Sequence, residues 1–213
     1  LQHYEEYRTE LEETLRKTEA ALQHCCETVT EIRKKYAKEL ADQTRQALLE
    51  LNFLDVQFEM KFGRLDHYTA NGLDETRFMI STNPGETVKP LGKVASGGEL
   101  SRIMLAVKSV LADADAIETL IFDEIDTGIS GRTAQKVSEK MAVIARKHQV
   151  ICITHLPQIA AMADDHYVIE KSAMEQRTIT EIYHLSDDAS VGEIARLLGG
   201  VEITDAVMHN ARE

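Results

Sequence analysis

Two consecutive carboxylates, Asp123 and Glu124, end the apolar run 120–122. An apolar strand that ends in adjacent acids is unusual, because charged side chains are costly to bury. Side chains alternate along a strand, so the two carboxylates point to different sides and are able to perform different tasks. One is suited to hold a hydrated magnesium ion and the other to polarise an attacking water. For this pair taken alone, a solvated strand end is the alternative explanation.

The segment Ser96-Gly97-Gly98-Glu99 has the spacing of a helix start. Ser-x-x-Glu is a capping box, with Ser96 at the N-cap and Glu99 at the third helical position. Capping does not explain the two glycines, since each costs up to about 1 kcal/mol relative to alanine in a helix. Without side chains there, another backbone or a phosphate is able to approach the positive end of the helix. A capped helix and an anion-binding helix start both remain open.

His155 ends a second apolar run, residues 150–154. A single histidine at such a boundary needs no functional explanation. If the run is a parallel strand, however, its carboxyl end meets the same sheet edge as Asp123 and Glu124, where ligands of open α/β sheets bind. An imidazole N–H at that edge would donate to a terminal phosphate or to the attacking water.

A phosphate-binding loop of the form Gly-x-x-x-x-Gly-Lys-Ser/Thr does not occur in the sequence. The nearest pattern, from Gly85 to Lys93, places six residues between its glycines instead of four. Val94 follows the lysine and has no hydroxyl for a magnesium ion, and Pro90 removes one backbone N–H. The sequence therefore contains candidate catalytic carboxylates but no primary phosphate-binding loop.

Residues 1–50 contain no Gly and no Pro, and predict one long helix. Residues that are apolar, or that a coiled-coil seam tolerates, follow one another at alternating intervals of four and three. This is the heptad period of a coiled coil. These seam residues are Leu11, Leu15, Thr18, Leu22, Cys25, Val29, Ile32 and Tyr36. An amphipathic helix on a globular core is the alternative. No second helix of matching length and period follows, so we expect the coiled-coil partner outside this chain.

Residues 51–213 predict an α/β lobe. A period of two over 56–60 and a second short strand candidate at 77–80, with the turn signal Asn71-Gly72 between them, favour a hairpin, and 81–94 is typical of a loop. Helices are expected over 98–112, 131–147, near 157, 190–198 and 204–212, and strands over 119–123, 150–154, 166–170 and 178–184. Helices that alternate with apolar strands favour a mainly parallel, buried sheet with flanking helices.

The composition limits the class of protein. A net charge of −12, 5% aromatic residues and no Trp argue against an extended nucleic-acid face or stacking platform on this segment. Three cysteines, two of them adjacent, do not form a disulfide framework and fit a reducing cytosol. No apolar run approaches the roughly 20 residues of a membrane span. The chain starts inside a helical pattern and without Met, as expected for a piece of a longer protein.

In this order and spacing, the segments resemble the carboxyl-terminal half of an ABC-type ATPase head, a P-loop NTPase-like fold. Within that group, they most resemble the bacterial DNA repair ATPases of the structural-maintenance-of-chromosomes (SMC) class. The resemblance runs through residues 81–86, 94–104, 122–132 and 153–163, and the helical arm fits as well. It implies a coiled-coil arm at 1–50 and a carboxyl-terminal head lobe at 51–213.

The resemblance also implies roles for individual residues. Ala95 and the segment Ser96, Gly97, Gly98 and Glu99 would form the signature loop, which reaches ATP held by an opposing head. Asp123 would support Mg²⁺ through water, Glu124 would be the catalytic base, and His155 the switch histidine. A loop that crosses the dimer interface would consist of Asp126, Thr127, Gly128, Ile129 and Ser130. Here Asp-Thr-Gly-Ile-Ser replaces the commoner Ser-Ala-Leu-Asp.

For the whole protein, the resemblance implies ATP hydrolysis in recombinational repair of double-strand breaks, in the bacterial cytoplasm at the nucleoid. ATP and Mg²⁺ would be the cofactors. The partners would be an amino-terminal head half, a second head and DNA, and no membrane. This chain alone would not hydrolyse ATP.

Two alternatives belong to other classes of function. One is a coiled-coil adaptor or oligomerisation module that does not hydrolyse nucleotide, against which the intact acidic pair argues. The other is direct DNA binding through Arg33-Lys34-Lys35 or Arg146-Lys147-His148, although such clusters are more often solvated helix faces.

Overall fold

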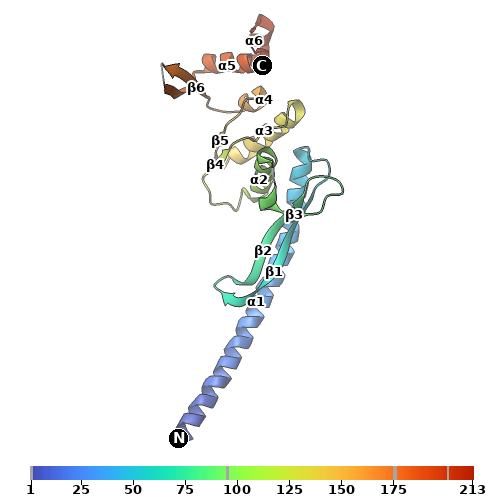
Figure 1. The fold of residues 1–213 in the computed structure, drawn as a ribbon, viewed down its shortest axis with the longest axis vertical. Helices are drawn as coiled ribbons and strands as arrows, with labels where there is room; N and C mark the ends of the chain where they lie inside the picture. The colour runs from blue at the N-terminus through green and yellow to red at the C-terminus, as the bar shows by residue number, and fades with distance from the viewer. Residues whose placement is uncertain (1, 95, 175–176, 201) are drawn as a thin grey trace. The chain divides into compact units, whose positions relative to one another are not determined.

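The computed structural model describes residues 2–94, 96–174, 177–200 and 202–213. The chain forms two compact units, Leu1–Gln46 with Leu54–Lys93, and Ala47–Phe53 with Val94–Glu213 (Figure 1). This grouping differs from the expected division at residue 50, because a hairpin that follows the long helix belongs to the same unit as most of that helix. Ala95, assigned above to the signature loop, lies outside the described residues.

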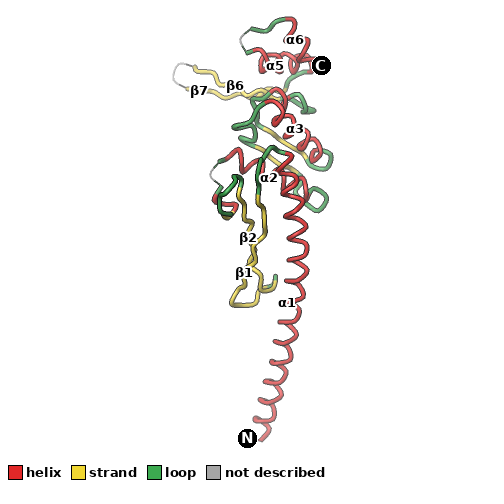
Figure 2. The backbone as a smooth tube through the Cα atoms, turned by 90° about the vertical axis from the view of Figure 1, so that its right-hand side faces the viewer, coloured by secondary structure: helices red, strands yellow, loops and turns green. Residues whose placement is uncertain are grey.

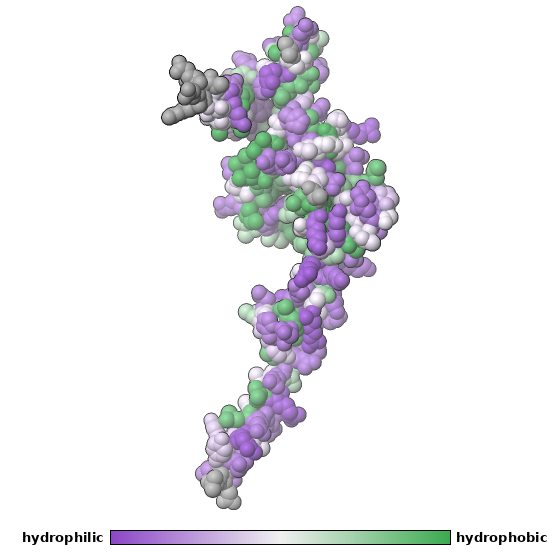
Figure 3. Space-filling model, viewed as in Figure 1, coloured by the Kyte–Doolittle hydropathy of each residue, from purple (hydrophilic) through white to green (hydrophobic). Residues whose placement is uncertain are grey.

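Helix α1 spans Gln2–Glu50 without interruption, as predicted from a segment that lacks Gly and Pro. Its apolar seam is exposed: the large side chains there are Leu11, Leu15, Leu22, Val29, Ile32 and Tyr36. Apolar surface is visible among polar residues along this part of the arm in Figure 3. An exposed heptad stripe is what an unpaired coiled-coil helix presents, so the coiled coil itself stays a prediction.

Strands β1 (Gln57–Thr69) and β2 (Gly72–Ser81) pair antiparallel around the predicted Asn71-Gly72 turn. Gly72 has φ 92°, a conformation that glycine adopts without steric cost. Both strands are longer than predicted. In β1 the residues near the turn are mostly exposed, so the alternation of buried and exposed residues that predicted the start of the strand does not continue there. The expected loop contains a two-residue strand, β3 (Lys89–Pro90), at the edge of β2, and the 3-10 helix η1 (Leu91–Lys93).

The hairpin runs alongside α1, as Figure 2 shows. Asp74 of β2 accepts hydrogen bonds from Thr30 Oγ1 at 2.7 Å and Arg33 Nη1 at 2.8 Å. Burial acts to raise the pKa of Asp74, but the bonds from Arg33 and Thr30 outweigh it and hold the pKa below its usual range. The buried residues of this second stripe on α1 are Cys26, Ala37, Ala41 and Thr44. The helix therefore has one stripe that packs against the hairpin and another that is exposed.

The second unit contains α2 (Gly97–Leu111), β4 (Thr119–Phe122), α3 (Gly131–Ala145) and β5 (Gln149–Cys152). Strands β4 and β5 pair in parallel, as the sequence predicted. Leu120 and Phe122 are buried on one face, in a core with Ile103, Ile125 and Val137. On the other face Ile121 is 68% exposed, so the expected burial holds for one side of the pair only.

The rest of this unit consists of α4 (Pro157–Ala160), β6 (Tyr167–Met174), β7 (Arg177–His184), α5 (Asp187–Gly199) and α6 (Asp205–Arg212). Strands β6 and β7 form a separate antiparallel pair instead of extending the parallel sheet. Strands separated by so short a connection can pair only antiparallel, since a parallel crossover needs a dozen or more residues. The parallel part of the fold is therefore small.

Candidate functional site

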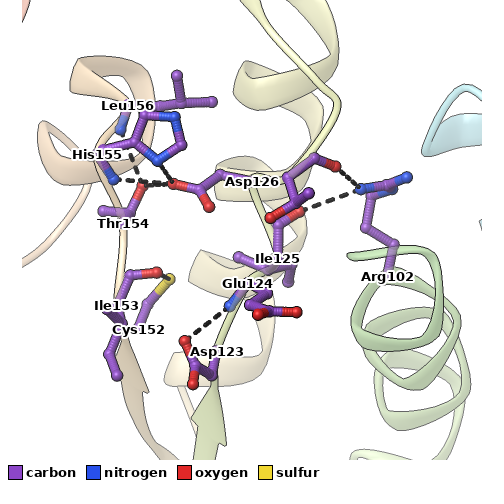
Figure 4. Close-up of polar contacts among 11 residues, drawn as sticks. Arg102, Asp123, Glu124, Ile125, Asp126, Cys152, Ile153, Thr154, His155 and Leu156 are labelled. Atoms are coloured by element: carbon purple, nitrogen blue, oxygen red, sulfur yellow. Dashed lines mark hydrogen bonds and ion pairs between the residues drawn. The ribbon is translucent and has the colours of Figure 1, made fainter. Parts of the chain in front are cut away.

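The register of the parallel pair brings the predicted site residues together. Phe122 is the partner of Cys152, and Ile153 N donates to Phe122 O at 3.0 Å, which continues the ladder by one bond. The chain segments that leave β4 and β5 therefore start at the same edge. Asp123, Glu124 and His155 follow directly, and Figure 4 shows them along this edge. All three side chains belong to exposed residues, as a site open to a ligand requires.

Asp126 joins the two strand ends. It is only 4% exposed, and its Oδ2 accepts hydrogen bonds from Thr154 Oγ1 at 2.6 Å and from His155 N at 2.8 Å. The same oxygen lies 2.9 Å from Nδ1 of His155, whose side chain is 72% exposed. A carboxylate at Nδ1 requires a proton there, which leaves Nε2 as the ring atom available to a substrate.

The family resemblance implied that Asp126 belongs to an interface loop, and the contact with His155 was not predicted. The signal lies in the register, because Asp126 and Thr154 both follow paired parallel strands by a few residues. In the rest of that loop, Thr127, Gly128 and Ser130 are exposed and Ile129 is half-buried. A role of the loop at a dimer interface remains a prediction.

The backbone turns sharply at Glu124, which has φ 57°. A non-glycine residue with positive φ is uncommon and costs on the order of 1 kcal/mol or more. The turn is closed by two hydrogen bonds: Glu124 N donates to Asp123 Oδ1 at 2.9 Å, and Thr127 N donates to Glu124 O at 3.0 Å. The chain thus turns away from the strand where the two acids follow each other.

The start of α2 packs against this turn. Ser96 is the N-cap, and its Oγ accepts from Glu99 N at 3.3 Å, which confirms that Ser96 caps this helix. A Cβ at Gly98 would lie 2.8 Å from Thr127 O and 3.0 Å from Glu124 O, and one at Gly97 would meet the Glu124 carboxylate. The two glycines allow either another backbone or a phosphate to approach the helix start. In this structure a backbone approaches it, that of the Glu124 turn in the same chain.

Cys152, at the end of β5, has a strongly perturbed thiol. Burial, together with the charges of Asp126 and Asp123, raises its pKa to about 12. The thiol is therefore neutral at physiological pH, and neither nucleophilic nor metal-binding thiolate chemistry is expected from it.

Asp123 fits a magnesium ion that keeps most of its own waters. Its carboxylate is on an exposed residue, and only Oδ1 is used, as the acceptor for Glu124 N. Within residues 2–94, 96–174, 177–200 and 202–213, no group of three or more His, Cys, Asp or Glu side chains is placed to hold a metal ion. Magnesium is commonly bound through one or two carboxylates plus substrate phosphates, so one carboxylate at this edge is sufficient. No described helix is long and apolar enough to cross a membrane.

Comparison with known proteins gives sequence relatives along nearly the whole chain. The chain is 44% identical to DNA repair protein RecN of Halalkalibacterium halodurans over 99% of its own length and 38% of that protein. It is also 44% identical to DNA repair protein RecN of Bacillus subtilis, over 87% of the chain and 35% of that protein. The chain thus spans about a third of the length of these curated relatives. No protein-family model matches it.

Among solved structures, the fold is similar to the Smc head domain with a coiled coil and joint from Pyrococcus yayanosii. The TM-score is 0.53 at 20% identity, over 89% of this chain and 36% of that one. At this identity the likeness concerns the fold alone. It supports the α/β head-like fold with a long amino-terminal helix that the family resemblance implied.

Proposed function

We propose that this chain forms a carboxyl-terminal head lobe with one arm helix of an SMC-like ATPase. The premise is its homology to part of the RecN DNA repair proteins. In this proposal residues 1–50 are the arm and residues 51–213 the head lobe. The whole protein hydrolyses ATP in recombinational repair of DNA double-strand breaks, in the bacterial cytoplasm. The observation that supports it most is that Asp123, Glu124 and His155 lie along one sheet edge.

Each of these residues has a role that its geometry suits. Glu124, exposed on its turn, takes the proton of the attacking water. His155, held through Nδ1 by Asp126, donates from Nε2 to the terminal phosphate or the water. Asp123 would hold a hydrated Mg²⁺, and that ion would supply positive charge to the phosphates of ATP.

The remaining predicted residues act between two heads. Ser96 Oγ and the amides of Gly97 and Gly98 lie at the start of α2, where a helix favours anions. In the proposal this signature loop, with Glu99, contacts ATP held by a second head, and loop 126–130 faces that head. The amino-terminal part of the protein supplies the phosphate loop that this sequence lacks. DNA is bound by the complete assembly.

The test is reconstitution. The chain by itself should hydrolyse ATP at background rate, and turnover should appear when the amino-terminal part of the same protein is added. A reconstituted sample with Glu124→Gln serves as the control, since it should bind ATP without hydrolysing it. Turnover by the chain alone, or normal turnover with Glu124→Gln, contradicts the proposal.

A coiled-coil adaptor without hydrolysis is the second candidate, and the exposed seam of α1 favours it. Both candidates expect α1 to pair with another helix, but only the ATPase expects ATP to bring two heads together. Sedimentation of the full-length protein with and without ATP separates them: an ATP-independent oligomer with no turnover supports the adaptor.

A further inference from the structure

Arg102 lies in the second turn of α2 and is a buried residue, 8% exposed. Its Nη1 donates to Thr127 O at 2.9 Å and to Ile125 O at 3.3 Å, as Figure 4 shows for Ile125. Its guanidinium carbon lies 5.7 Å from the ring centroid of Phe53. Burying a charge is costly unless its hydrogen bonds compensate. Both bonds of this buried charge go to the backbone that follows Glu124.

Burial lowers the pKa of the Arg102 guanidinium, and the charge of Glu99 partly offsets this shift. Arginine nevertheless stays protonated in proteins, so its bonds to the carbonyls are charge-assisted. Such bonds are roughly twice as strong as neutral ones. The residue is therefore well suited to hold a backbone segment in an unfavourable conformation.

Two neighbours of Arg102 hold the same segment. Ser101 Oγ donates to Asp123 O at 2.7 Å, directly before the turn. Gly98 packs so closely that a Cβ there would clash with Thr127 O. The first two turns of α2 thus hold the segment both before and after Glu124.

We infer that Arg102 is a positioning residue for Glu124, which it acts on by fixing the carbonyls of Ile125 and Thr127 against α2. The positive φ of Glu124 makes this necessary, because a strained turn persists only where surrounding contacts determine it. The inference rests on the proposed function, in which Glu124 is the catalytic base. In that function the start of α2 contacts ATP bound by a second head. Because Arg102 lies on α2 and is bonded to the turn of Glu124, it also connects this contact with the catalytic base.

The experiment uses the full-length protein that contains this chain. Arg102→Met removes the charge and keeps an apolar stem of similar reach, Arg102→Lys restores a charged donor, and Arg16→Met at an exposed position of α1 is the control. We expect Arg102→Met to lower kcat on the order of 100-fold, as misplacement of a catalytic group does. KM for ATP should stay within about threefold, since binding is not removed. Arg102→Lys should recover part of the loss, and Arg16→Met should behave as wild type.

A second readout follows the turn itself. Thr127 N is bonded to Glu124 O, so its hydrogen–deuterium exchange reports whether the turn is closed. Exchange at residues 124–129 should be faster in Arg102→Met than in wild type, with the rest of α2 unchanged. Should Arg102→Met not fold, Ser101→Ala removes only the bond to Asp123 O. It should lower kcat about tenfold and speed the same exchange.

Wild-type kcat with wild-type exchange in Arg102→Met overturns the inference. So does a lower kcat with exchange that is unchanged in 124–129, or a loss that Arg102→Lys does not reduce. If Glu124→Gln keeps full turnover, the proposed function fails instead. The exchange of residues 124–129 then decides by itself whether Arg102 holds the turn.

Discussion

The ring of His155 meets the carboxylate of Asp126 across the parallel strand pair, with Nδ1 2.9 Å from Oδ2. Asp126 is buried and His155 is exposed, so the acid is the fixed partner and the imidazole is the one that faces solvent. The same carboxylate oxygen also accepts from the backbone N–H of His155. One buried acid therefore sets both the main chain and the ring orientation of the histidine.

Asp126→Ala should destabilise the protein by about 1–3 kcal/mol, because it leaves the half-buried donors Thr154 Oγ1 and His155 N without their acceptor. Asp126→Asn keeps an acceptor oxygen and should cost less. Urea unfolding measures both, with the exposed Asp164→Asn as the control. Equal stability of Asp126→Ala and wild type would show that these bonds contribute nothing.

In the full-length enzyme, Asp126→Asn should also reduce turnover more than ATP binding. The charge that holds Nδ1 of His155 is lost while the fold is largely kept. Steady-state kinetics against ATP separates kcat from KM. If KM changes and kcat does not, His155 has no part in the chemical step.

Substitutions of Glu124 should affect the stability of the protein and its ATPase activity differently. Glu124→Gly accommodates φ 57° without strain and should leave stability unchanged or raise it by about 1 kcal/mol. The same substitution should abolish turnover in the full-length protein, since the proposed base is removed. Thermal unfolding and an ATPase assay on the same preparation test both statements. Glu124→Val is the matched contrast, because a β-branched residue at positive φ should destabilise the turn.

Local signals in the sequence were sufficient where one segment determines its own structure. Asn71-Gly72 predicted the hairpin, and the lack of Gly and Pro predicted α1. The two apolar runs predicted the β4–β5 pair, and their common edge then followed from the direction of the strands. This is why Asp123, Glu124 and His155 were expected together before their geometry was known.

Contacts between distant segments were not predictable in the same way. Arg102 and Thr127 are 25 positions apart, and nothing near either residue indicates the other. The two glycines of α2 signalled a close approach, but not that the approaching group is the turn of Glu124. The second stripe of α1 was also missed, because Ala37, Ala41 and Thr44 are small residues that stand out weakly beside the larger seam residues.

Cys152 should resist alkylation at pH 8 in the folded protein. Its thiol pKa is raised to about 12, so almost no thiolate is present at that pH. Cys25, an exposed residue on α1, should react readily and serves as the internal control.

The Cys152 thiol keeps its proton to higher pH in the folded state than in the unfolded state. The free energy of unfolding should therefore fall as pH rises from about 9 to about 12. Peptide mass mapping after iodoacetamide treatment checks the reactivity, and rapid labelling of Cys152 at pH 8 would contradict the burial of its thiol.

The Asp74–Arg33 pair should make the attachment of the hairpin to α1 dependent on pH. The Asp74 side chain is only 7% exposed, and its folded-state pKa lies below the ordinary value of 3.8. Its stabilisation is therefore present above about pH 4 and is lost as pH falls through the folded-state pKa. Asp74→Asn should cost about 2 kcal/mol at pH 7, the value of a hydrogen bond to a charged group, and much less at pH 2. A double-mutant cycle with Arg33→Met, followed by urea unfolding, measures the coupling. Strictly additive costs at pH 7, or an Asp74→Asn cost that does not shrink in acid, would show that this contact does not hold the hairpin to the helix.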